Sequence, residues 1–113
     1  MASRIVAIRG YHAHVYFDPD EIDRARRVAE NARDACGCPI GHFHSQPVGP
    51  HPRGSVQLSL RPEQFGAFAA WASEGREGLT IFAHGLSGND LADHTLYVIW
   101  FGNSEPLDLS IFG

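Results

Sequence analysis

The sequence predicts an α+β fold in which two helices cover one face of an antiparallel sheet that has one extra strand. Three observations support this prediction. Polar and apolar residues alternate at residues 11–18 and 55–60, as in half-buried strands. Helix-start signals followed by helically spaced apolar residues occur at Pro19 and Pro62. The predicted elements follow the order β-α-β-β-α-β plus one strand, which is the ferredoxin-like arrangement.

The size and charge of the chain exclude several classes of protein. With 113 residues in all, we expect residues 1–113 to form one domain. The formal net charge is −4 and the basic residues form no long run, so we expect no nucleic-acid partner. No apolar run reaches the length of a membrane span, and residues 1–6 lack the apolar core of a signal peptide. We therefore expect a cytoplasmic protein with no membrane partner.

The reactive residues narrow the chemistry further. All nine basic residues are arginine, which excludes a Schiff-base lysine and a phosphate-loop lysine. Cys36 and Cys38 are one residue apart, so a disulfide between them would be strained. Their place at a predicted helix end makes a metal site there the less favoured interpretation. Seven histidines remain, so we expect any catalysis to use imidazole side chains.

The strand at residues 11–18, after a short β-prone lead-in at residues 4–9, is the centre of the prediction. Successive side chains of a strand point to opposite faces. One face then carries the apolar set of Tyr11, Ala13, Val15 and Phe17. The other face carries His12, His14 and Tyr16. Two imidazoles on one face are compatible with a metal or acid–base site and equally with a solvated surface.

The first helix is predicted at residues 19–36. Asp18, Pro19 and Glu21 form a capping sequence, and Gly37 is a typical stop. The apolar stripe of this helix consists of Ile22, Ala25, Ala29, Ala32 and Cys36. Its arginine-rich face consists of Arg24, Arg26, Arg27 and Arg33. We interpret this second face as solvated and without a function.

A second strand is predicted at residues 39–48 and carries His42 and His44. Three prolines and a glycine at residues 47–52 prevent regular strand pairing, so this segment should be a rigid loop that fixes His51. In the third strand, at residues 55–60, Gln57 faces the same side as the other polar residues.

The second half of the chain predicts a helix and two more strands. The helix at residues 62–73 has an apolar stripe of Phe65, Phe68, Ala69 and Ala72. Trp71 lies off this stripe, where it either lines a pocket or interface or packs in the core. The fourth strand, residues 79–83, leads into His84, and the last strand is predicted at residues 95–101. A loop at residues 85–94 separates the two.

In the ferredoxin-like strand order, the first strand pairs antiparallel with the fourth. This pairing brings His12 and His14 toward His84 on the face without helices. His44 and His94 are expected near the same end of the sheet. Imidazoles suit zinc, iron, copper and nickel, bound by three nitrogens or by two nitrogens and a carboxylate. The carboxylates that could ligate, or could hold a ligating imidazole, are Asp90 and Asp93.

Three sequence blocks give a more specific indication. They are Tyr-His-Ala-His-Val-Tyr-Phe at residues 11–17, His-Ser-Gln-Pro-Val-Gly-Pro-His-Pro at residues 44–52, and His84 with Gly-Asn-Asp-Leu-Ala-Asp-His at residues 88–94. In order and spacing these blocks resemble the DOPA 4,5-dioxygenase family. The resemblance implies a ferredoxin-like domain, often dimeric, that cleaves a catechol such as DOPA by metal-dependent extradiol chemistry.

The resemblance also implies site roles, which we combine with the strand parity. His12, His14 and His84 are the expected ligands of a ferrous ion, for which zinc or another divalent metal could substitute on purification. His44 and His94 are the acid–base candidates, and either could exchange roles with one of the ligands. The expected substrate-binding residues are Tyr16, His51 and Gln57, and His42 is expected at the surface. The partners would be a catechol, dioxygen and a second copy of the chain. The alternative is a non-catalytic, dimeric ferredoxin-like domain that binds a metal or a small molecule.

Overall fold

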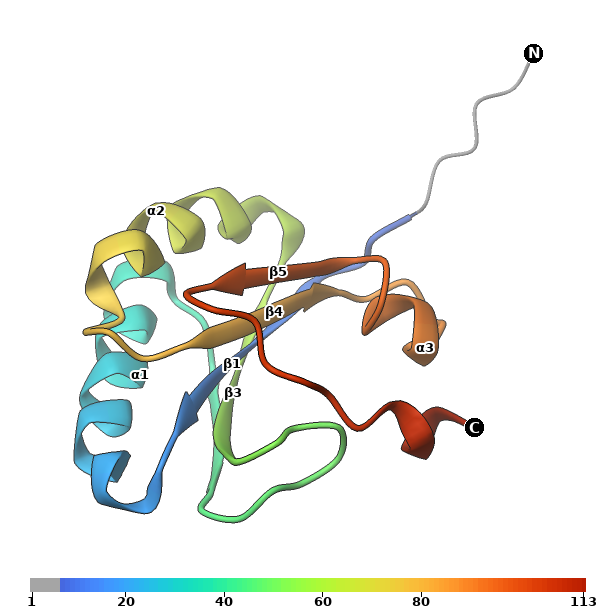
Figure 1. Ribbon diagram of the computed structural model, residues 1–113. Coiled ribbons are helices and arrows are strands. Elements are labelled where there is room, and N and C mark those ends of the chain that lie inside the picture. The colour runs from blue at the N-terminus through green and yellow to red at the C-terminus, as the bar shows by residue number, and fades with distance from the viewer. Residues whose placement is uncertain (1–6) are drawn as a thin grey trace.

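The computed structural model describes residues 7–113 and has the predicted architecture (Figure 1). Five strands form one antiparallel sheet in the order β2-β3-β1-β4-β5. They are β1 (Tyr11–Phe17), β2 (Ile40–His44), β3 (Gly54–Leu60), β4 (Ile81–Gly85) and β5 (Val98–Phe101). The first half of the lead-in predicted at residues 4–9 lies outside the described residues, and residues 7–9 form no strand.

The central strand β1 separates a core face from a polar face, as its alternation predicts. Ala13, Val15 and Phe17 are fully buried against the helices. β1 pairs with β3 and with β4 over most of its length, so both of its edges are hydrogen-bonded. The polar face of β1 therefore lies in the middle of the sheet, with polar or aromatic neighbours on either side.

The two main helices, α1 (Ile22–Cys36) and α2 (Phe65–Gly75), pack against each other on one face of the sheet (Figure 1). A short 3-10 turn precedes each of them, η1 (Pro19–Glu21) and η2 (Pro62–Gln64). The Glu21 carboxylate accepts a hydrogen bond from the Asp18 backbone N–H at 2.8 Å, as expected for this start sequence. Gly37 ends α1 in the left-handed conformation at φ 75°, and its N–H donates to the Arg33 carbonyl.

Several predicted boundaries were wrong. β2 ends at His44 instead of Val48, because the chain bends at residues 45–46 and the proline-rich loop follows. β5 begins three residues later than predicted, since residues 94–97 continue the turn that follows α3 (Asp90–Asp93). That four-residue helix lies in the segment predicted as a loop, and the Asn89 side chain caps its start.

Irregular segments border the face of the sheet that the two main helices leave free. The loop between β2 and β3, helix α3 and the turn η3 (Leu109–Phe112) lie on this side (Figure 1). The C-terminal segment is tied to the loop by a hydrogen bond from the Asp108 N–H to the Pro50 carbonyl at 2.9 Å.

Trp71 packs against the core beside Phe68, as one of its two interpretations predicts. In the described part of the chain, no helix has the length and apolar character of a membrane span.

Candidate metal centre

The pairing of β1 with β4 brings three histidines together on the free face of the sheet. His12 lies directly opposite His84 in the strand register, and His14 is two residues further along β1. One ring nitrogen from each of His12, His14 and His84 lies within 4.8 Å of the other two. We call this group the three-histidine cluster. His14 and His84 are buried, with 4% and 2% of their surfaces exposed, and His12 is partly exposed.

The geometry of this cluster fits a metal ion bound by imidazole. The Nε2 atoms of His14 and His84 are 3.2 Å apart. Two nitrogens that each lie about 2.1 Å from one ion, at adjacent coordination positions, are roughly 3.0–3.4 Å apart. Nδ1 of His84 is 3.1 Å from the Gly85 carbonyl, which can only accept a hydrogen bond. The hydrogen of the neutral ring is therefore on Nδ1, and Nε2 keeps its lone pair for a metal.

Burial keeps the cluster uncharged, which metal binding requires. Desolvation, reinforced by the neighbouring imidazoles, holds the pKa of His14 well below its usual value. Desolvation also lowers the pKa of His84 to about 4, against the opposing effect of its hydrogen bond to Gly85. The pKa of His12 is lowered by burial and by His94, while Asp93 partly offsets this. All three rings are thus neutral near pH 7 and able to ligate.

A cavity of about 280 Å³ opens beside the cluster. His94, at the end of α3, forms part of its wall and packs against His84, with ring centroids 4.2 Å apart and ring planes tilted by 40°. Nδ1 of His94 lies 2.7 Å from the Asp90 carbonyl, so the hydrogen is again on Nδ1 and Nε2 can accept a proton. Phe112, from the C-terminal segment, also lines this cavity and packs on His94 at 4.5 Å between centroids.

Of the three residues expected to bind substrate, His51 and Gln57 line the 280 Å³ cavity. Tyr16 does not line this cavity but contacts His51. The Tyr16 hydroxyl is 2.8 Å from Nδ1 of His51, and the rings of His51 and His14 are 4.1 Å apart. Desolvation raises the pKa of Tyr16 and lowers the pKa of His51 to about 4. The proline-rich loop therefore places His51 against the cluster.

His44 is further from the cluster than expected, because β2 runs in the same direction as β1 and ends level with the opposite end of β1 from His12. It pairs with Ser55, which in turn lies opposite Tyr16 and not opposite His12. Its side chain lines a separate cavity of about 200 Å³, together with His42 and Val48. His14, His51 and Gln57 line both cavities and so form the wall between them. His42 is exposed, as expected, although its ring lies 4.7 Å from that of His44.

The two candidate carboxylates do not join the three-histidine cluster. Asp93 is buried, and its carboxylate accepts hydrogen bonds from the backbone N–H and the hydroxyl of Ser87. It therefore fixes the turn after β4. Asp90 lines the 280 Å³ cavity, and its main-chain carbonyl orients His94. Phe112, which lines the same cavity, was not predicted as a site residue. The only sequence signal for it was a short apolar tail.

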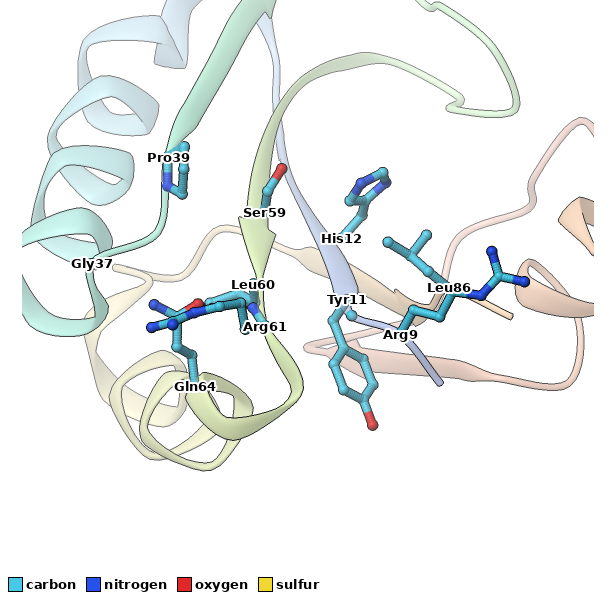
Figure 2. Close-up of a pocket in the computed structure, with 11 residues that line it drawn as sticks. Arg9, Tyr11, His12, Gly37, Pro39, Ser59, Leu60, Arg61, Gln64 and Leu86 are labelled. Atoms are coloured by element: carbon cyan, nitrogen blue, oxygen red, sulfur yellow. Dashed lines mark hydrogen bonds between the residues drawn. The ribbon is translucent and has the colours of Figure 1, made fainter. Parts of the chain in front are cut away.

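A larger cavity of about 410 Å³ lies next to His12, at the end of the sheet (Figure 2). His12 and Leu86 line this cavity and the 280 Å³ cavity alike, so the two spaces share a wall. In Figure 2, Arg61 and Gln64 lie at one end of this cavity. Arg9 lies at the other end, and its side chain points away from Arg61. Ser59, from β3, lies between them on the polar face.

Related proteins cover most of the chain. The crystal structure of a "putative dioxygenase" from Nostoc punctiforme PCC 73102 superposes with a TM-score of 0.90 and 36% sequence identity, over 98% of this chain and 96% of that one. A DOPA 4,5-dioxygenase from Amanita muscaria is 29% identical over 91% of this chain and 49% of its own length. An uncharacterized 21.2 kDa protein from Botryotinia fuckeliana is 34% identical over 92% and 64%, respectively. The chain thus spans about half to two thirds of the length of these curated relatives.

The family match agrees with the resemblance of the three sequence blocks. Residues 11–111 match the Dopa 4,5-dioxygenase family. This range begins at the start of β1 and ends in η3, so it contains all five strands and both main helices. The chain therefore belongs to the Dopa 4,5-dioxygenase family.

Proposed function

We propose that this chain is a metal-dependent extradiol dioxygenase that cleaves the ring of a catechol such as DOPA. The observation that carries the proposal is the three-histidine cluster at the wall of a cavity that also contains a lone-pair imidazole, His94. Three neutral nitrogen ligands leave coordination positions for substrate. Membership of the Dopa 4,5-dioxygenase family supports the assignment of these positions to a catechol and dioxygen.

The proposed metal is Fe(II), held by His12, His14 and His84, with zinc or another divalent ion as a substitute on purification. A bound ferrous ion would supply the centre at which the two catechol oxygens and dioxygen meet and exchange charge. In extradiol cleavage, both oxygen atoms of dioxygen enter the product, and the carbon–carbon bond next to the diol breaks. The protein contributes a desolvated site, since His14 and His84 are almost fully buried.

His94 is the proposed general base. Its Nε2 carries a lone pair because Nδ1–H donates to the Asp90 carbonyl, and its ring packs against His84 at the edge of the cavity. A catechol hydroxyl bound at the cluster would transfer its proton to this nitrogen. We propose His44 as a second acid–base candidate. Its 200 Å³ cavity is separated from the 280 Å³ cavity by a wall that includes His14 and His51.

The substrate ring is proposed to occupy the 280 Å³ cavity, where His51 and Gln57 supply polar contacts and Phe112 supplies an aromatic one. A side chain on the ring could extend past Leu86 into the 410 Å³ cavity beside His12 (Figure 2). We further propose that residues 1–113 form one domain that acts as a cytoplasmic homodimer. Exposed Leu91, Leu96 and Ile111 are apolar side chains that a partner copy would cover.

Anaerobic reconstitution with ferrous iron tests the proposal. After the protein is mixed with air-saturated catechols, among them DOPA and 4-methylcatechol, absorbance scans should show a ring-cleavage product whose spectrum identifies the bond broken. Tyr97→Phe is the matched control, because Tyr97 lines none of the three cavities. Iron binding without cleavage of any catechol would favour the non-catalytic metal-binding alternative. Failure to bind any divalent metal would contradict the assignment of the cluster as a metal centre and would leave only a small-molecule-binding domain.

A further inference from the structure

Three imidazoles that line the 280 Å³ cavity have Nδ1 atoms with different partners. In His84 and His94, Nδ1 faces a backbone carbonyl, of Gly85 and Asp90 respectively. Carbonyl oxygens only accept, so both rings carry hydrogen on Nδ1 and present a bare Nε2. In His51, Nδ1 faces a hydroxyl group, that of Tyr16, at 2.8 Å. A hydroxyl can donate or accept, so the direction of this bond decides which nitrogen of His51 carries its hydrogen.

Burial of Tyr16 determines the direction. Its side chain is fully buried, and within residues 7–113 its hydroxyl has no hydrogen-bond partner other than His51. If the hydroxyl accepted from His51, its own hydrogen would be left unsatisfied in the protein interior, which is unfavourable. Arg53, whose guanidinium lies 5.9 Å from the centre of the Tyr16 ring, has only donors and offers no alternative acceptor. The Tyr16 O–H therefore donates to Nδ1 of His51.

The consequence is that neutral His51 carries its hydrogen on Nε2. This nitrogen makes no hydrogen bond within the described residues, and it is not among the side-chain atoms that are buried without a partner. His51 lines the 280 Å³ cavity and lies against His14, a member of the three-histidine cluster. Its N–H group is thus available to a ligand in the cavity, whereas His94 offers a lone pair on the side of His84.

We propose that Tyr16 is a positioning residue that fixes His51 as a hydrogen-bond donor to an anionic oxygen of the ligand bound at the three-histidine cluster. His51 and His94 then have complementary roles, the first donating a hydrogen bond and the second accepting a proton. The chemical class of the ligand, a catechol that binds as its anion, rests on the proposed function. The hydrogen position on His51 does not, because it follows from the contacts of Tyr16 alone.

Imidazole nitrogen-15 spectra test the hydrogen position directly. In zinc-loaded protein labelled at histidine, His51 should show a protonated Nε2 and a bare Nδ1. Tyr16→Phe removes only the hydroxyl, and it should shift His51 toward a mixture of both tautomers while His84 and His94 stay unchanged. Tyr97→Phe is the matched control, since Tyr97 lines none of the three cavities. A hydrogen on Nδ1 of His51 in the unaltered protein would overturn the proposal.

Binding of 4-methylcatechol to the zinc-loaded protein tests the donor role. His51→Phe should weaken binding by about 10-fold or more, because a hydrogen bond to a charged group is lost. His51→Gln keeps an N–H donor and should recover most of that loss, and Tyr16→Phe should lie between the two. Equal affinities for all four proteins would refute the donor role. If the unaltered protein binds no catechol, the proposed function fails, and the nitrogen-15 spectra still decide the contact between Tyr16 and His51.

Discussion

The buried, uncharged histidines should make the metal-free protein lose stability as the pH falls from 7 to 5. His51 and His84 have pKa values of about 4 in the folded chain, mainly because burial disfavours their charged forms. In the unfolded chain a histidine has a pKa of about 6.5. Between these values the unfolded state binds more protons, so the free energy of unfolding decreases as the pH decreases. The contribution of these rings is fully present above about pH 6.5 and is lost toward pH 4.

The size of the effect follows from these pKa values. Between pH 7 and pH 5, a histidine whose pKa falls from 6.5 to about 4 on folding contributes roughly 2 kcal/mol to the loss of stability. His51 and His84 together should account for roughly 4 kcal/mol, a large share of the 5–15 kcal/mol typical of a domain. His14, whose pKa is lowered in the same direction, adds to this loss.

Urea unfolding with a chelator present, at pH 7, 6 and 5, measures this dependence. Carboxylates also titrate toward pH 5, so the informative quantity is the difference between variants. His84→Gln and His51→Gln should each remove roughly 2 kcal/mol of the loss between pH 7 and pH 5, whatever their stability at pH 7. If both variants follow the pH dependence of the unaltered protein, these rings are not held neutral by burial. The electrostatic account of the site would then be wrong.

Three other predictions concern the site and its surroundings. Alanine at any one position of the cluster should abolish iron binding and ring cleavage together, as measured by metal analysis and oxygen uptake. Full iron occupancy in both His14→Ala and His84→Ala would contradict the ligand assignment. His94→Ala should keep iron and slow turnover by about 10²–10⁴-fold, whereas His44→Ala should have a smaller effect if its separate cavity isolates it. Charge reversal at Arg26 and Arg27, which contact Phe43 and Glu77 far from the cluster, should change neither turnover nor iron content; a large loss of either would reveal an anion site on α1.

The fold was predictable because its signals are local. Alternation along β1 and β3 assigned their two faces, and the capping sequences at Pro19 and Pro62 located both main helices. The antiparallel pairing of β1 with β4 then placed His84 opposite His12, as the assumed strand order required. Residues on neighbouring strands can thus be brought together by parity and topology alone.

Other parts of the site depend on contacts that no local pattern encodes. His44 was expected near the same end of the sheet as His12, but β2 runs in the same direction as β1, so His44 at the end of β2 lies near Tyr16 instead. The register of β2 against β3 also shifts between Ile40 and Phe43, where Gly41 lies close to the backbone of Gln57. Phe112 reaches the cavity because the Asp108 N–H binds the Pro50 carbonyl, a contact between segments 58 residues apart. Neither a bulge nor the path of a C-terminal segment follows from residue spacing.

The same residue type serves different purposes in this site because each ring has a different neighbour. His84 donates its Nδ1–H to the carbonyl of Gly85, the next residue on its own strand, and therefore directs a bare nitrogen toward His14. His94 donates to a carbonyl one helical turn earlier and offers its lone pair to the cavity. The loop that carries His51 brings its ring to a buried phenol instead of a carbonyl, which reverses the position of the hydrogen. Strand parity and register therefore bring His12, His14 and His84 together. Among the rings of the site, the partner of Nδ1 determines whether a ring can ligate, accept a proton or donate a hydrogen bond.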